Sequence, residues 1–342
     1  METVEIDGSF GEGGGQVLRT SLTLAAITGK RLHISNIRAN RSNPGLAKQH
    51  LVCVKAACAV CNAGSSGAEL RSTKLDFMPG SVKPGNYNFD IGSAGSASLV
   101  IQTILPVLFT ADRSSTVAVA GGTHNPWAPP FDFLNESFVP AIDEMDFKAD
   151  CQLVRYGFYP AGGGEILFEV QPVRDEKAKP LDLYEPMVKP EIYAVVYTSK
   201  LPNRVVQRQR RLIAECGLPL AGFEHIEVTD SAGPGNCVVF RIVGANRTSV
   251  FTGFGSKGKP SEKVIDEVVT EAREYLSSGA AIDHHLADQL LIYMAMRRSG
   301  RLTTNVLSGH LETNIEVIKK FLPVDFAVNK RNDVFEVCCK GI

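Results

Sequence analysis

The sequence lacks both a long apolar run and an excess of either charge. The nearest apolar run, Ala97 to Ala111, is broken by Gln102 and Pro106, and a membrane span needs ~18 unbroken residues. Lys and Arg number 36 against 37 Asp and Glu, for a formal net charge of −1. With 44% apolar residues, this balance excludes a disordered chain and argues against a protein that coats nucleic acid without specificity.

A secretory signature and paired metal-binding cysteines are also missing. Residues 1–5 are acidic, whereas a secretory signal peptide begins with basic residues that are followed by an apolar stretch. We therefore expect a soluble, cytoplasmic protein with no membrane partner. Cys58 and Cys61 form a C-x-x-C, but none of the other six cysteines supplies a second pair. Because both lie in a stretch with helical apolar spacing, buried and reduced structural thiols are favoured over a zinc site or a disulfide.

What the sequence does contain is a recurring unit. A polar or glycine-rich loop precedes an apolar helix, a strand, a second helix and a β-hairpin, with low residue identity between copies. The predicted elements are helix 16–28, strand 32–37 and helix 45–61 in the first copy; helix 98–109, strand 116–120 and helix 131–145 in the second; and helix 284–297, strand 302–306 and helix 310–322 in the third.

An additional segment precedes the third copy. Residues 181–277 predict a strand, a helix, three strands and a helix of their own, entered through the charged, proline-bearing linker 174–180. We therefore predict an α/β (α+β) protein of two domains. Residues 1–180 and 278–342 form a large domain of three repeated units, and residues 181–277 form a smaller inserted α/β domain.

The loops that precede the helices indicate phosphate chemistry. The first turn of a helix carries unpaired N–H groups and a partial positive charge, and pseudo-symmetry could gather several such turns on one side. The run Gly13 to Gly15 is neither a Walker A loop, which needs Gly-Lys-Ser/Thr, nor a dinucleotide fingerprint, because Gln16 replaces the third glycine. It would allow a ligand to approach the backbone beside the Glu12 carboxylate. A tight strand-to-helix turn is the alternative.

A basic segment follows the first repeated strand. Arg38 and Arg41 precede a predicted helix whose first turn holds Gln49 and His50, and Arg19 lies one turn inside the first helix. The arginine fork matches phosphate oxygens, so this composition favours phosphate binding over a merely solvated loop.

Three further features leave alternatives open. Trp127, the only tryptophan, stands between prolines and suits either a rigid wall for a planar ring or a packed turn. The run Gly162 to Gly164 precedes a strand and favours a bulge or hairpin over an anion site. His310 begins an amphipathic helix, where a helix N-terminus disfavours the charged ring; a neutral imidazole there could attack phosphorus, while a capping or packing role fits equally.

Eight segments match, in order and spacing, motifs of a known family. The chain resembles the RNA 3′-terminal phosphate cyclases over nearly its whole length, and least in the insert. The segments are 7–19, 37–46, 49–51, 92–96, 121–123, 157–164, 286–290 and 309–314.

The resemblance implies a fold and a reaction. The fold is three repeated α/β units like the C-terminal domain of a translation initiation factor, with an inserted domain. A histidine attacks the α-phosphate of ATP and releases pyrophosphate, AMP passes to an RNA 3′-phosphate, and the 2′-OH displaces AMP to leave a 2′,3′-cyclic phosphate. The implied partners are ATP, Mg²⁺ or Mn²⁺, and an RNA with a 3′-phosphate end; a homodimer stays open.

The resemblance also assigns roles to residues of this chain. His310 resembles the nucleophile, and Glu12 resembles the residue that meets the metal. The positions that resemble the nucleotide pocket are Gln102, Pro129, His285, Leu286, Ala287, Asp288 and Gln289. Those that resemble the phosphate or RNA site are Arg19, Arg38, Arg41, Gln49 and His50. His285 is a departure from the family pattern, because the family has tyrosine at this position.

Two rival functions remain. One is a non-catalytic cyclase-like ribosome-assembly factor, a branch that lacks the histidine. The other is a phosphate-substrate transferase that shares only the repeat architecture. Because this chain keeps His310 together with Glu12 and Arg41, the enzyme is favoured. Covalent labelling of the protein by α-labelled ATP separates the three.

Overall fold

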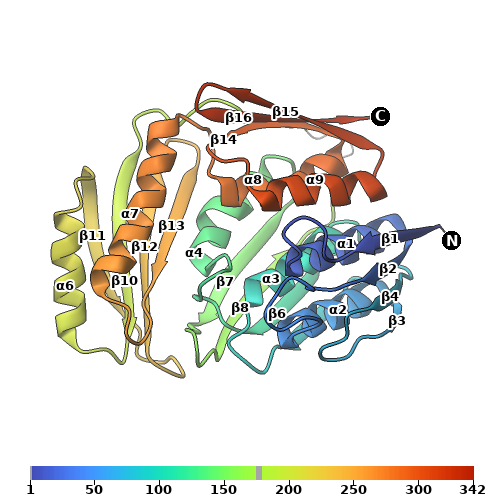
Figure 1. Ribbon diagram of the computed structural model, residues 1–342, viewed down its shortest axis with the longest axis horizontal. Helices are drawn as coiled ribbons and strands as arrows, with labels where there is room; N and C mark the ends of the chain where they lie inside the picture. Colours follow the sequence, from blue (N-terminus) through green and yellow to red (C-terminus); the bar gives the residue numbers. More distant parts are fainter. Residues whose placement is uncertain (1, 175–178) are drawn as a thin grey trace.

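The computed structural model describes residues 2–174 and 179–342. Within these ranges the strands form four four-stranded sheets, and helices alternate with them (Figure 1). The predicted α/β class is confirmed. Residues 175–178 of the predicted linker lie outside the described residues. No helix in the described part of the chain is long and apolar enough to cross a membrane.

The first unit is a βαβαββ arrangement whose sheet has the order β1-β2-β4-β3. β1 and β2 run parallel, whereas the β4 pairings are antiparallel. Gly45 is left-handed (φ 78°) and donates its N–H to Ile37 O, so the second helix begins at Lys48 rather than at the predicted Gly45. The elements are β1 (Thr3–Asp7), α1 (Gly15–Thr28), β2 (Arg31–Ser35), α2 (Lys48–Cys61), β3 (Gly64–Ser66) and β4 (Leu75–Met78).

The second unit repeats this topology, with the sheet order β5-β6-β8-β7. The single helix predicted for 131–145 is instead three consecutive segments with a π-helical turn in the middle. Pro140 has no N–H to donate to the carbonyl four residues earlier, which accounts for the irregularity. The elements are β5 (Asn86–Asp90), α3 (Ala97–Leu108), β6 (Ser115–Gly121), α4 (Phe131–Phe133), η1 (Leu134–Phe138), α5 (Val139–Asp143), β7 (Ala149–Arg155) and β8 (Gly164–Val170).

The third unit has the same order, β9-β14-β16-β15, but its first strand is separated from the rest. β9 pairs in parallel with β14, with Leu181 opposite Gly300, and so belongs to this sheet. The predicted start of the insert at Leu181 is therefore wrong, because a three-residue strand carries no periodic signal. The elements are β9 (Leu181–Leu183), α8 (His284–Arg297), β14 (Ser299–Thr304), α9 (Gly309–Phe321), β15 (Val324–Arg331) and β16 (Val334–Gly341).

The residues between β9 and α8 build a fourth sheet, ordered β11-β10-β12-β13. Successive side chains of its central strands enter two different cores. Val196 and Phe240 pack with α6 and α7, whereas Tyr197 and Val239 belong to the core of the large domain. The elements are β10 (Glu191–Ser199), α6 (Asn203–Ala214), β11 (Leu220–Glu227), β12 (Gly235–Val243), β13 (Thr248–Phe254) and α7 (Ser261–Ser278).

The helices of the three units pack against one another in the middle of the large domain, and the three sheets lie outside them (Figure 1). α1 contacts α2, α3 and α9, and α8 contacts α9. Four predicted helices (α1, α3, α8 and α9) agree with the structure to within one residue at each end. The insert lies at one end of the molecule, opposite the two chain termini (Figure 1). This packing of the helices determines which of their N-terminal ends lie close together.

Candidate active site

The starts of α1, α2 and α3 meet, as predicted. The Oε1 atom of Gln49, in the first turn of α2, accepts from the Ser96 N–H at 2.6 Å, beside the start of α3. The Ser98 hydroxyl donates to the Pro129 carbonyl at 2.6 Å, which ties the segment before α4 to the same region. His50 faces the first residue of α1, Gly15. The starts of three helices, from the first and second units, therefore come together.

The glycine run leaves room for polar side chains rather than only making a turn. A Cβ atom on Gly15 would lie 2.2 Å from His50 Nε2 and 2.9 Å from Arg19 Nη1. A Cβ atom on Gly14 would lie 2.9 Å from Arg41 Nη2. Because no side chain intervenes, Arg19, Arg41 and His50 all reach the start of α1. We call these three side chains at the start of α1 the cradle; arginine forks and an imidazole N–H are donors that can bind an anion.

His310 and Glu12 are in direct contact. The Ser308 hydroxyl caps α9 by accepting from the Leu311 N–H at 3.1 Å, and His310 lies in this first turn. The His310 Nε2 atom lies 2.9 Å from Glu12 Oε2, and both side chains are partly exposed. The other ring nitrogen, Nδ1, is buried without a hydrogen-bond partner within the described residues. The structure therefore brings the predicted nucleophile and the predicted metal residue together from the third and first units.

Asp288 links the three helices behind this pair. Its Oδ1 atom accepts from Gln16 of α1 and Asn314 of α9, and Asn314 in turn accepts from the Thr20 hydroxyl at 2.7 Å. Desolvation raises the pKa of the Asp288 carboxyl, while its proximity to His310 and both amide donors oppose this shift. Gln16 and Asn314 both lie inside the matched motifs, but neither was expected to have a role in the site.

The other predicted nucleotide positions divide into two groups. Gln102 of α3 donates to Gln289 of α8, so these two side chains face each other. Leu286 and Ala287 are buried in the core and present no side chain to solvent.

His285, the departure from the family pattern, is exposed. Its ring packs against that of His284, with the centroids 4.0 Å apart, and its Nε2 atom lies 3.9 Å from Glu271 Oε2. The nearest carboxylate partner of His285 is therefore on α7, an element of the insert.

Arg38 has a local partner set that its sequence position did not reveal. Its Nη1 atom donates to the carbonyls of Asn43 and Gly45, at 2.9 and 2.7 Å. The guanidinium thus braces the loop that carries Arg41, in addition to adding positive charge near His50. The Trp127 side chain is 91% exposed, so the packed-turn alternative is wrong. Gly162 and Gly163 lie in the β7–β8 hairpin, as favoured.

The described residues contain no group of three or more His, Cys, Asp or Glu side chains arranged to hold a metal. Mg²⁺ is commonly bound by one or two carboxylates together with substrate phosphates, so the single Glu12 carboxylate beside the cradle fits that donor set. A hollow of about 430 Å³ lies elsewhere, between the third unit and the insert, and none of the predicted site residues lines it.

His50 is buried as the neutral ring. Its Nδ1 atom accepts from the Ala47 N–H at 3.3 Å, which caps α2 and leaves the ring proton on Nε2, toward Gly15. Desolvation, with the nearby charges of Arg19 and Arg38, lowers the pKa of His50 to about 3. His50 is thus an N–H donor to the cradle across the physiological pH range.

This pKa predicts a pH-dependent stability. Below pH 6.5 the unfolded chain protonates His50 and the folded chain does not, so stability falls as the pH falls toward 3. Between pH 7 and 5, the wild type should lose about 2 kcal/mol more unfolding free energy than His50→Gln. Urea titrations at both pH values measure this difference. Equal losses in the two proteins would contradict the buried, neutral ring.

Comparisons with known proteins agree with this geometry. A family model described as RNA 3′-terminal phosphate cyclase matches residues 10–328. A relative of that name from Pseudomonas fluorescens is 43% identical, over 100% of this chain and 99% of its own. Another, from Ralstonia nicotianae, is 45% identical over 96% of this chain and 94% of its own. Since the matched region includes Glu12, the basic segment and the start of α9, the chain belongs to the RNA 3′-terminal phosphate cyclase family.

Proposed function

We propose that this enzyme uses ATP to convert an RNA 3′-terminal phosphate into a 2′,3′-cyclic phosphate, through a covalent His310–AMP intermediate. The observation that carries the proposal is the contact between His310 and Glu12 at the start of α9, beside the cradle of Arg19, Arg41 and His50. A nucleophile, a metal-binding carboxylate and cations for phosphate oxygens are thus adjacent. The overall reaction is that of a ligase acting in RNA processing, which we place in the cytoplasm.

The first step is adenylation of His310. In the contact with Glu12, the ring N–H on Nε2 donates to the carboxylate, so the lone pair is on Nδ1. Attack through Nε2 requires the other tautomer, with the proton on Nδ1. A divalent metal held by Glu12 and ATP phosphate oxygens would neutralise anionic charge at this position. A Glu12 carboxylate bound to such a metal would no longer accept the hydrogen bond from Nε2.

In the adenylation step one bond forms and one bond breaks. The Nε2 lone pair forms a bond to the α-phosphorus, the bond to the bridging oxygen of the β-phosphate breaks, and pyrophosphate leaves. Arg19, Arg41 and the Nε2 proton of His50 stabilise the phosphate oxygens, as do the helix N–H groups at the start of α9.

The next two steps move AMP and then release it. An oxygen of the RNA 3′-phosphate attacks the same phosphorus, and the P–N bond breaks to return the electron pair to Nε2. The ribose 2′-OH then attacks the activated 3′-phosphorus, loses its proton and displaces AMP. Because the 2′-OH supplies the nucleophile of the last step, RNA ends can be cyclised and DNA ends cannot. The basic cradle holds one end rather than a duplex, which fits a near-zero net charge.

We place the adenosine of ATP beside the facing pair Gln102 and Gln289 and the ring of Pro129. His285, which replaces the family tyrosine, lies at the edge of this region. Its imidazole ring is planar and aromatic, as the tyrosine ring is.

His310→Asn should abolish covalent labelling by α-labelled ATP while the protein stays folded, since Asn keeps a polar side chain at the helix start. The variant should still cyclise an RNA end that is supplied already adenylated. His33→Asn is a matched control, because His33 also pairs with a carboxylate, Asp76, at 3.2 Å. Label that persists in His310→Asn would place the nucleophile elsewhere. Acid-labile, alkali-stable label in the wild type would identify a phosphoramidate.

Glu12→Gln removes the carboxylate charge but keeps the shape of the side chain. We expect the Mg²⁺ or Mn²⁺ concentration for half-maximal adenylation to rise by about tenfold or more, as loss of a hard anionic ligand predicts. The control is Asp76→Asn, which removes the partner of His33. A metal titration that overlays the wild-type curve would show that Glu12 does not bind the metal.

Arg41→Ala removes a charge-assisted contact worth roughly 1.5–3 kcal/mol, so cyclisation should fall at least about tenfold. The melting temperature should barely change. Arg113→Ala, at an exposed arginine paired only with neighbouring Asp112 among the described residues, serves as the control and should behave as wild type. A strongly destabilised Arg41→Ala protein would make this side chain structural.

A further inference from the structure

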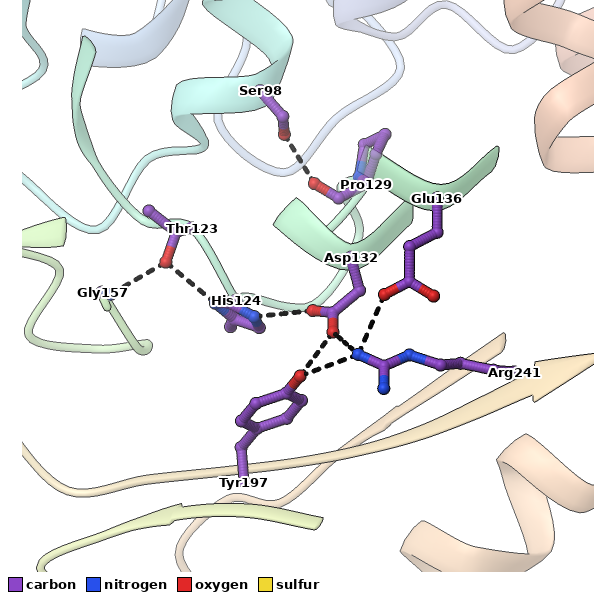
Figure 2. Close-up of polar contacts among 9 residues, drawn as sticks. All are labelled: Ser98, Thr123, His124, Pro129, Asp132, Glu136, Gly157, Tyr197 and Arg241. Atoms are coloured by element: carbon purple, nitrogen blue, oxygen red, sulfur yellow. Dashed lines mark hydrogen bonds and ion pairs between the residues drawn. The ribbon is translucent and has the colours of Figure 1, made fainter. Parts of the chain in front are cut away.

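A buried polar network joins the insert to the loop that carries Pro129 (Figure 2). Its members come from the second unit and from two strands of the insert, and they are His124, Asp132, Glu136, Tyr197 and Arg241. None of them has a part in the reaction proposed above.

The half of the network within the second unit fixes a hydrogen-bond direction. The Gly157 N–H donates to the Thr123 hydroxyl at 2.9 Å, and that hydroxyl is hydrogen-bonded to His124 Nδ1, also 2.9 Å away. Because the ionised Asp132 carboxylate can only accept, the Nε2 N–H of His124 donates to Asp132 Oδ2 at 2.8 Å. His124 and Asp132 are 1% and 3% exposed, so water does not compete for these bonds.

The insert supplies the remaining partners of Asp132. The Tyr197 hydroxyl of β10 donates to Asp132 Oδ1 at 2.6 Å, and Arg241 Nη2 of β12 approaches the same oxygen at 2.9 Å. The guanidinium also pairs with Glu136 Oε1 at 2.9 Å. Burial alone would raise the pKa of Asp132, but its bonds and the nearby positive charge outweigh this and lower it to about 2. The Asp132 carboxylate is thus ionised, and both of its oxygens accept hydrogen bonds.

The network holds both ends of the loop that contains Trp127 and Pro129. His124 and Asp132 bracket the segment 125–131, and the Phe131 N–H donates to the Thr123 carbonyl at 3.0 Å. Between them lie Trp127 and Pro129, whose carbonyl accepts from Ser98 at the start of α3. Figure 2 shows the loop between the α3 contact and the strands of the insert. Its position therefore depends on partners from outside the second unit.

We propose that the insert takes part in nucleotide binding through Arg241 and Tyr197, which hold the His124–Asp132 pair and so position the loop of Trp127 and Pro129. Both are positioning residues, because they act on the loop through their bonds to Asp132. This inference rests on the proposed function only in assigning the loop to ATP. It gives the insert a role in the first step of the reaction.

The consequences of removing each partner differ in size. Arg241→Met leaves Asp132 buried with two neutral donors and leaves Glu136 without the cation that pairs with it here. Tyr197→Phe removes a single hydroxyl and keeps the ring in the core. Arg241→Lys restores a charge without the fork, so it should rescue in part. Ser137→Ala is the matched control, because the Ser137 hydroxyl also bonds the insert, at the Thr248 carbonyl, but away from the loop.

Trp127 provides a direct readout, since it is the only tryptophan in the chain. Its fluorescence anisotropy, measured without ATP, should fall in Arg241→Met and in Tyr197→Phe, because the loop gains motion. In adenylation with α-labelled ATP, the half-saturating ATP concentration should rise at least about fivefold, while labelling at saturating ATP stays within about twofold. Ser137→Ala should match the wild type in both measurements. If Arg241→Met fails to fold, Tyr197→Phe carries the test.

The outcomes separate the inference from the proposed function. If both network variants match Ser137→Ala in anisotropy and in ATP dependence, the network does not position the loop and the inference is overturned. A fall in saturated labelling with unchanged ATP dependence would also overturn it. If the wild type takes up no label, the proposed function fails, while the anisotropy of Trp127 still shows whether Arg241 and Tyr197 hold the loop.

Discussion

The absence of a side chain at Gly15 is the constraint on which the site depends. Any Cβ atom there would overlap His50 Nε2, so only glycine lets the first turn of α2 reach the start of α1. That approach brings Arg19 and Arg41 to the same place, and α9 then closes the site from the other side through His310 and Glu12. The cradle thus depends on helix packing in the core, which brings His50 to α1, and on the loop before α2, which carries Arg41.

Much of this could be predicted from local sequence. Helices with strong apolar periodicity, such as α1 and α8, have the ends that their spacing indicates, because burial of one face decides them. The repeated order of elements was also visible, and it implies gathered helix starts. His310 could be singled out by its position after Ser308-Gly309 at a helix N-terminus, although its partner could not.

The rest depends on pairings that no local pattern encodes. β9 is three residues long and becomes a strand only by pairing with β14. The contact between His310 and Glu12 joins residues from opposite ends of the chain, and the bond from Tyr197 to Asp132 crosses from the insert to the second unit. Arg38 has the composition of a phosphate ligand, yet its hydrogen bonds to Asn43 and Gly45 are set by loop conformation alone.

The insertion point between β9 and α8 has a consequence for how the chain folds. Asp182 of β9 meets Arg301 of β14, its partner 119 residues later. During synthesis, β9 therefore emerges long before the strand beside which it lies, and the third sheet closes only after the intervening chain is made. Loop closure over such a length is entropically costly for a flexible chain, but a compact insert shortens the effective loop. Folding of the insert thus prepares the third unit, and with it the helix that carries His310, for assembly.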